Sequence, residues 1–185
     1  AAGSQYNTGY GYVVLEDLTT GCRNTAFGAH SLGNTTTGKH NAAVGYNALA
    51  TNTVGDRSVA VGYQALVAQE PSSNADMYNT AIGFNAMVAS TTGVQNTAVG
   101  GTALDANTTG SYNTAVGVDA LTANTTASYN TALGRRAGYA LTTGAENVAI
   151  GYLALYTATT ASNNVAVGTS ALQANTSGTD NVAVG

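Results

Sequence analysis

The apolar residues of this chain recur with a long, fixed period. A five-residue block with the consensus N-T-A-V-G occurs eleven times, and nine of the ten intervals between blocks are 17 residues, while one is 21. Counted from the start of each block, the fourth and ninth positions are apolar in nearly every copy. We expect these two columns to form the interior of a solenoid in which each repeat makes one turn. The fourth position holds Phe27, Val44, Val61, Ile82, Val99, Val116, Leu133, Ile150, Val167 and Val184, and the ninth holds Leu15, Leu32, Leu49, Leu66, Met87, Leu104, Leu121, Leu155 and Leu172.

The block itself is predicted to be a β-strand. Its third position is Ala in ten copies and Gly9 in the first, and it alternates with Thr or Val, which is the period of two that strands show. We expect each turn to contain a short strand, a glycine corner, a second short strand and a polar N-T-T turn. A short helical turn at Y-x-A-L-x-A is the alternative for the second strand. The small third position is expected to meet a close neighbour, which we take to be another chain.

Asparagine and glycine occupy the most regular positions of the repeat. Asn begins ten of the eleven blocks, with Ser58 in the remaining one, and Gly ends all eleven. Stacked asparagines can hydrogen-bond one another and the neighbouring backbone, so we predict an asparagine ladder beside a column of glycine corners. The ladder comprises Asn24, Asn41, Asn79, Asn96, Asn113, Asn130, Asn147 and Asn164, and the corners comprise Gly28, Gly45, Gly62, Gly83, Gly100, Gly117, Gly134, Gly151 and Gly168.

These patterns predict an all-β fold, a parallel β-solenoid of the β-roll or β-helix type. About eleven turns of 17 residues, with strands about 4.8 Å apart, give a rod on the order of 50 Å long. Residues 1–185 are predicted to be a single array with a four-residue insertion within 67–78. The array has no caps, which solenoids need, so we expect a segment of a longer fibre, or a subunit of a head-to-tail filament.

Self-association is expected because a single chain buries little. Each buried Val or Leu stabilises by about 1.5–3 kcal/mol, whereas ordering one residue costs about 1–2 kcal/mol of backbone entropy. We therefore predict a homotrimer.

Composition narrows the possible partners. Only 8% of residues are charged and the net charge is −4, which argues against nucleic acid because phosphates require clustered Lys and Arg. Cys22 is the only cysteine, so no intrachain disulfide is expected. No apolar run is long enough to predict membrane insertion.

The repeats resemble those of known fibres. The copies NAAVGYNAL (41–49), NTAVGGTAL (96–104) and NTAVGVDAL (113–121) look like repeats of phage tail-fibre proteins and related bacterial surface proteins. The copies SVAVGYQA (58–65), NVAIGYLA (147–154) and NVAVGTSA (164–171) are similar to the heads of trimeric autotransporter adhesins, which are left-handed parallel β-rolls. The resemblance implies a trimer located outside the cell or on a virion surface.

Little in the sequence suggests chemistry. His30 and His40 occupy different repeat positions, so we expect no metal site, no cofactor and no enzyme activity. Two departures from the repeat are candidate surface sites for binding. One is the insertion, which carries Glu70 and Asp76, and the other is the residue before each block, where Arg23, His40 and Arg57 precede Tyr112 and Tyr129. A third departure is Arg135-Arg136, with which Glu146 is expected to pair.

Three functions are compatible with these patterns. The favoured one is a shaft segment of a phage tail fibre or surface appendage that supports host or surface attachment. The first alternative is an adhesin head in which the row of Arg23, His40 and Arg57, together with the tyrosines, binds cell-surface glycans. The second alternative is an ice-binding solenoid, which needs a regular Thr face, although Val replaces Thr in the second block position at residues 59, 148, 165 and 182.

Overall fold

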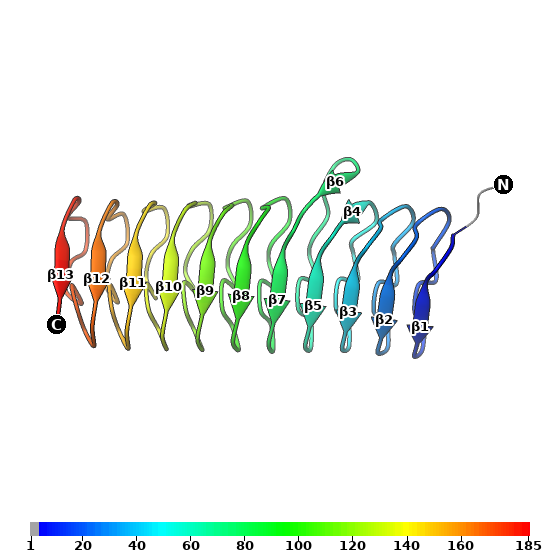
Figure 1. Cartoon of the computed structure of the whole chain (residues 1–185), viewed down its shortest axis with the longest axis horizontal. Helices are drawn as coiled ribbons and strands as arrows, with labels where there is room; N and C mark the ends of the chain where they lie inside the picture. Colours follow the sequence, from blue (N-terminus) through cyan, green and yellow to red (C-terminus); the bar gives the residue numbers. More distant parts are fainter. Residues whose placement is uncertain (1–3) are drawn as a thin grey trace.

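The chain is a parallel β-solenoid, as predicted. A computed structural model describes residues 4–185 as an all-β rod of about ten turns, with no helix among the described residues. Eleven three-residue strands, one from each block, form a single parallel sheet along the rod (Figure 1). These strands are β1 (Thr8–Tyr10), β2 (Thr25–Phe27), β3 (Ala42–Val44), β5 (Val59–Val61), β7 (Thr80–Ile82), β8 (Thr97–Val99), β9 (Thr114–Val116), β10 (Thr131–Leu133), β11 (Val148–Ile150), β12 (Val165–Val167) and β13 (Val182–Val184).

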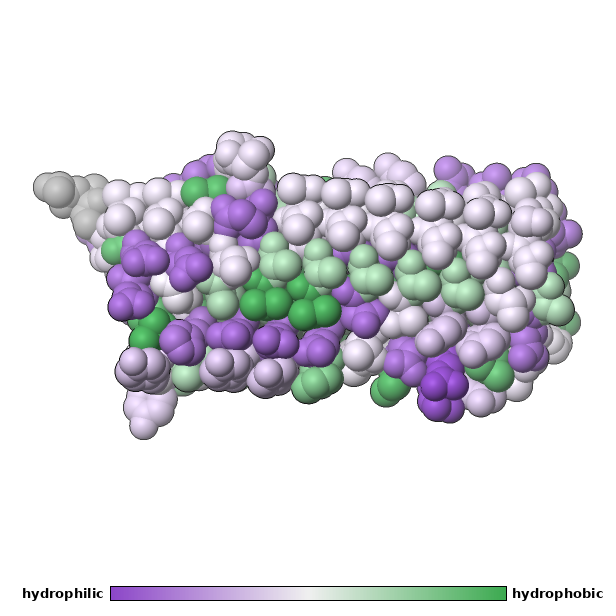
Figure 2. All heavy atoms as spheres, turned by 180° about the vertical axis from the view of Figure 1, so that it is seen from behind, coloured by the Kyte–Doolittle hydropathy of each residue, from purple (hydrophilic) through white to green (hydrophobic). Residues whose placement is uncertain are grey.

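Every turn stacks on the next without a shift in register. The middle residue of each strand faces the middle residue of its neighbour, so that Ala98 pairs with Ala115 and Ala115 with Ala132. Equivalent side chains therefore form straight rows. Figure 2, which views the rod from behind, shows such rows of like hydropathy running along its length.

The second strand predicted in each repeat is absent from the described turns, and so is the helical alternative. Three overlapping turns replace it, in which the N–H groups of Ala48, Ala50 and Asn52 donate to the carbonyls of Gly45, Asn47 and Leu49 over 3.3–3.4 Å. Asn47 and Leu49 have φ values of +55° and +52°. A leucine in this left-handed region is strained. Because residues with positive φ alternate here with residues with negative φ, the segment can continue neither a strand nor a helix. Full burial of the Leu49 side chain offsets that strain.

The core differs from the predicted one at one of its two columns. The ninth position is confirmed, because Leu32, Leu49 and Leu66 are fully buried. The fourth position, predicted to be inside, is wrong: Val44 is 41% and Leu133 is 48% exposed. The small third position, exemplified by Ala98, is buried instead. This position is the middle residue of the strand, and side chains alternate between the two sides of a strand. The middle residue therefore faces the interior of its own chain, and not another chain, while the residues on either side of it point outward.

The glycine corners stack because only hydrogen fits between them. Gly28 has a φ of +126°, and a Cβ atom there would lie 2.6 Å from the carbonyl oxygen of Gly45 in the next turn. The same conflict recurs at every corner from Gly11 to Gly168, so a side chain at any of them would push two turns apart.

The insertion forms the one irregular feature of the described rod. Two short strands, β4 (Gly55–Asp56) and β6 (Ala75–Asp76), pair in parallel and extend from one edge of the rod (Figure 1). The loop between them returns to the body, since Thr37 Oγ1 donates to Asn74 Oδ1 over 3.1 Å.

Candidate functional site

The block asparagines form a buried amide ladder through the rod. The Oδ1 atom of Asn24 accepts a hydrogen bond from the N–H of Asn41 at 2.9 Å, and its Nδ2 atom donates to the carbonyl of Gly38 at 2.8 Å. Asn113 repeats both contacts with Asn130 and Ala127. Each amide thus satisfies one donor and one acceptor of the following turn, which are backbone groups that would otherwise be buried without partners.

Ser58 interrupts this ladder, and Gln69 spans the interruption. Gln69 is fully buried. Its Oε1 atom accepts hydrogen bonds from Ser58 Oγ at 3.1 Å and Asn79 Nδ2 at 2.9 Å, while its Nε2 atom donates to Asn52 Oδ1 at 3.0 Å. The polar ladder therefore continues past the turn that contains the insertion.

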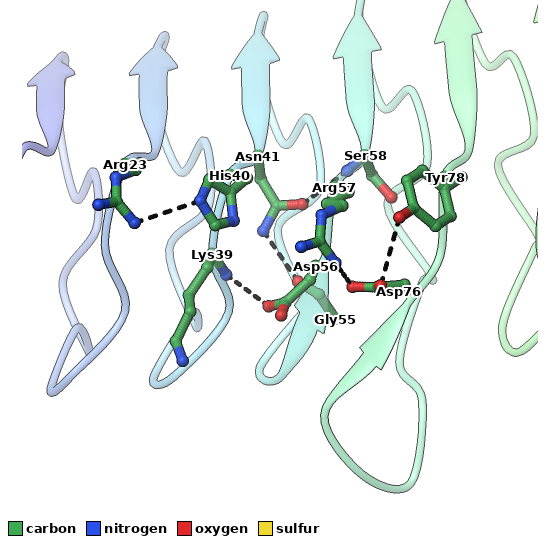
Figure 3. Close-up of polar contacts among 10 residues, drawn as sticks. All are labelled: Arg23, Lys39, His40, Asn41, Gly55, Asp56, Arg57, Ser58, Asp76 and Tyr78. Carbon is green, nitrogen blue, oxygen red and sulfur yellow. Dashed lines mark hydrogen bonds and ion pairs between the residues drawn. The ribbon is translucent and has the colours of Figure 1, made fainter.

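The predicted surface residues Arg23, His40 and Arg57 do lie in one row. Each precedes the strand of a successive turn, β2, β3 and β5 (Figure 3). Arg23 Nη1 and His40 Nε2 are 3.4 Å apart. All three side chains are exposed, so the row is open to a ligand.

The insertion contributes an acid to this row. Asp76 forms an ion pair with Arg57 and accepts a hydrogen bond from the hydroxyl of Tyr78 at 3.3 Å (Figure 3). The guanidinium of Arg57 also lies 5.6 Å from the centre of the Tyr78 ring. Glu70 is not part of this cluster, because its carboxylate accepts from the N–H and hydroxyl of Thr53. The pairing of Arg57 with Asp76 leaves Arg23 as the arginine of the row without an acidic partner among the described residues.

Tyr112 and Tyr129 form a separate pair farther along the rod. Their rings are stacked with centres 4.9 Å apart and planes 4° apart. Stacking covers the facing sides of both rings, so the outer face of each ring, its edge and its hydroxyl are what the pair can present to a ligand. Gln95 and the turns between separate this pair from Tyr78, so the predicted residues form two clusters and not one site.

A polar triad that sequence analysis missed lies on the turn side. Asp119 accepts hydrogen bonds from Thr102 Oγ1 at 2.7 Å and from Arg136 Nε at 3.1 Å. The hydrogen bond from Thr102, followed by the bond and charge of Arg136, holds the pKa of Asp119 below its ordinary value against the opposing effect of burial. The predicted pairing of Glu146 with Arg135 or Arg136 is wrong: Arg136 pairs with Asp119, and the guanidinium of Arg135 lies 5.9 Å from the centre of the Tyr152 ring, with no ion pair to Glu146 among the described residues. The sequence could have indicated this triad, because Thr102, Asp119 and Arg136 follow one another at intervals of 17 residues.

The exposed large apolar side chains are concentrated on one side of the repeat. Eighteen such side chains are exposed in the described residues, and all lie at four positions: the residue before the block and its second, fourth and sixth residues. We call these positions the outer face. The eighteen are Tyr6, Tyr10, Tyr12, Phe27, Val44, Tyr46, Val59, Tyr63, Tyr78, Ile82, Phe84, Tyr112, Val118, Tyr129, Leu133, Tyr152, Val182 and Val184.

Within residues 4–185 there is no helix that is long and apolar enough to cross a membrane, and no group of three His, Cys, Asp or Glu side chains that could hold a metal ion. Comparison of the chain with models of known protein families, with curated proteins and with solved structures gave no match.

Proposed function

We propose that this chain is a structural rod, a shaft segment of an extracellular or virion-surface fibre that holds an attachment element away from its base. The observation that carries the proposal is the amide ladder, which runs from Asn7 to Asn181, is buried from Asn24 to Asn164 and is maintained by Gln69 at Ser58. A ladder of this kind ties each turn to the next through side chain and backbone together. It favours a stiff rod over a chain of separable units.

The hydrogen bonds of the ladder run along the rod, from one turn to the next. The Asn130 amide, for example, accepts from the N–H of Asn147 at 3.0 Å, and the strand residues of the same two turns pair directly. Pulling the ends of the rod apart would have to break several of these buried bonds at each turn. Such an arrangement suits a shaft under tension, and it requires no ligand.

Removal of whole turns tests this function. Deletion of residues 97–147 removes three repeats and joins Asn96 to Val148, which restores a complete block. A shaft predicts a rod shorter by about 14 Å, since strands are about 4.8 Å apart, with unchanged cooperative unfolding. Small-angle X-ray scattering and thermal unfolding measure both. A shaft also predicts that neither the parent chain nor the shortened chain binds a glycan array.

A glycan-binding head is the second candidate, and the unpaired cations favour it. Arg23 and Lys39 lie in successive turns beside His40 (Figure 3), and neither Arg23 nor Lys39 forms an ion pair within the described residues. An acidic sugar could bind between them. Specific binding of acidic glycans that is lost in the Arg23→Ala/Lys39→Ala variant, and retained when residues 97–147 are deleted, would favour this candidate over the shaft.

A further inference from the structure

The outer face is the surface that the function of a rod leaves unexplained. We infer that copies of this chain associate side by side through the outer face, with a second copy as the partner. This inference rests on the proposed function as a fibre component, and it names the surface that such a fibre would use. It also replaces the small third position, which lies in the core, as the contact surface.

The exposed large apolar side chains are confined to a few positions of the repeat. Monomeric proteins scatter such groups or hold them in patches of a few hundred Å², yet here all eighteen lie at four of the 17 repeat positions. Phe27, Ile82 and Leu133 are 40–48% exposed on strands along the rod. Figure 2, which views the opposite side, shows purple and pale residues there, with its largest green patch near the middle and smaller green areas toward the margins. The last residue of each of the eleven strands of the sheet is apolar or aromatic, so these residues form an apolar strip on the sheet side.

The centre of this strip carries no charge. The outward strand residues, at the second and fourth block positions, include no charged side chain in any of the eleven strands. Charges appear only at its margins, for example at Arg57 and Glu146 before the block and at Arg135 in its sixth position. Depletion of charge at the centre with Tyr and Arg around it is the composition of protein interfaces. Burial of this strip would therefore not remove any charged side chain at its centre from water.

The size of the strip determines how much of it a partner must cover. Eleven strands at about 4.8 Å span about 50 Å, and the strands with their flanking residues are roughly 15 Å wide, which gives roughly 750 Å². A stable protein interface buries about 800 Å² on each partner. The strip is therefore large enough for stable association only if a partner covers it along most of the rod.

The regular spacing of side chains along the strip identifies the partner. The side chains of the strip form two ridges, one at the second and one at the fourth block position, and equivalent residues recur at every turn, as Thr97, Thr114 and Thr131 do. A partner can fit this surface along its whole length only if its own surface repeats at the same spacing. A second copy of the chain has that spacing, whereas an ordinary globular partner does not.

Sedimentation of the purified chain with paired variants tests the inference. The Val99→Lys/Val116→Lys variant places two charges at the centre of the strip, on β8 and β9, and Thr109→Lys/Thr126→Lys places the same charges on exposed residues of the same two turns but outside the outer face. We expect the parent and the Thr109→Lys/Thr126→Lys control to sediment as multiples of 18.4 kDa at micromolar concentration. The Val99→Lys/Val116→Lys variant should associate only at protein concentrations at least 100-fold higher than those at which the parent associates.

A milder variant guards against misfolding. Val99→Thr/Val116→Thr keeps the branched shape and adds only hydroxyls on two half-buried residues that point outward from the sheet, so it should fold and still weaken association at least several-fold. Far-UV circular dichroism checks the fold of each variant. A parent chain that is a monomer at 200 µM would overturn the inference. So would folded Val99→Lys/Val116→Lys and Val99→Thr/Val116→Thr variants that both associate like the parent. A monomeric parent whose rod shortens on deletion of residues 97–147 would reject this interface and leave the shaft function standing.

Discussion

Gln69 receives a hydrogen bond from Ser58 at 3.1 Å, and so an insertion residue serves the one turn whose block does not begin with asparagine. The same Oε1 atom accepts from Asn79 at 2.9 Å. The serine and the insertion therefore occur together for a physical reason. The shorter side chain at position 58 leaves room in the core, and the extra residues of the loop accompany a longer amide that fills it.

Replacement of Gln69 tests this relationship. Gln69→Ala leaves the buried polar groups of Ser58, Asn79 and Asn52 without this partner, and each buried group without a partner costs about 1–3 kcal/mol. We expect a loss of about 2–4 kcal/mol in the free energy of unfolding, measured by urea denaturation. Gln64→Ala, at a half-buried glutamine without a side-chain hydrogen bond in the same turn, is the control and should change stability by less than about 0.5 kcal/mol. Equal effects would contradict the role of Gln69.

The ladder itself predicts a difference between two asparagines. Asn113→Leu removes the acceptor for the N–H of Asn130 and the donor to the carbonyl of Ala127, so it should cost about 2–5 kcal/mol. Asn34→Leu, at an exposed position, should be nearly neutral. Chemical denaturation with hydrogen exchange at Asn130 measures both the stability and the local opening. If Asn130 exchanges no faster in the Asn113 variant, the ladder does not hold the turns together.

Two adjacent glycines provide the sharpest test of the corner column. Gly100 has a φ of +137° and a Cβ there would lie 2.5 Å from the carbonyl oxygen of Gly117, whereas a Cβ on Gly101 meets no atom within 4 Å. Gly100→Ala should destabilise by more than about 2 kcal/mol. Gly101→Ala should be neutral or stabilise by up to about 1 kcal/mol, because it restricts the unfolded chain. Thermal unfolding of the two variants decides this, and similar melting temperatures would contradict the tight stacking of corners.

The lowered pKa of Asp119 predicts a dependence of stability on pH. A carboxyl whose pKa is lower in the folded than in the unfolded state contributes stability above its unfolded value, which is ordinarily 3.8, and loses it as pH falls through the folded value. Asp119→Asn should therefore be less stable than the parent at pH 7, and the difference should shrink below pH 3.8. Denaturation at pH 7 and pH 2.5 measures this. A difference that grows on acidification would have the wrong sign.

The sequence predicted the period, the parallel solenoid and the leucine column, because these depend on the spacing of residues alone. It did not determine which side of the strand faces inward. Ala98 and Val99 are both apolar, and the choice between them depends on the width of the interior, which the fully buried leucine of the same turn, Leu104, already fills. The left-handed turns at residues such as Leu49 also left no signal, since leucine does not ordinarily mark positive φ.

The position of the surface row was predictable from the sequence, but the interactions of its residues were not. The register of the repeat placed Arg23, His40 and Arg57 on successive turns, as the structure has them. The partners of these residues depend on the path of the insertion, which brings Asp76 to Arg57. The repeat pattern carries no information on that path, because the insertion is the segment that departs from it.

Cryo-electron microscopy of the purified chain is the most direct test of the central claim that this is a self-associating structural rod. We expect rods about 50 Å long with layers about 4.8 Å apart along the axis. Copies should lie side by side, with β8 and β9 of one copy facing the sheet of another. Isolated rods with the outer face free, or rods joined through the turn side that Figure 2 displays, would contradict it.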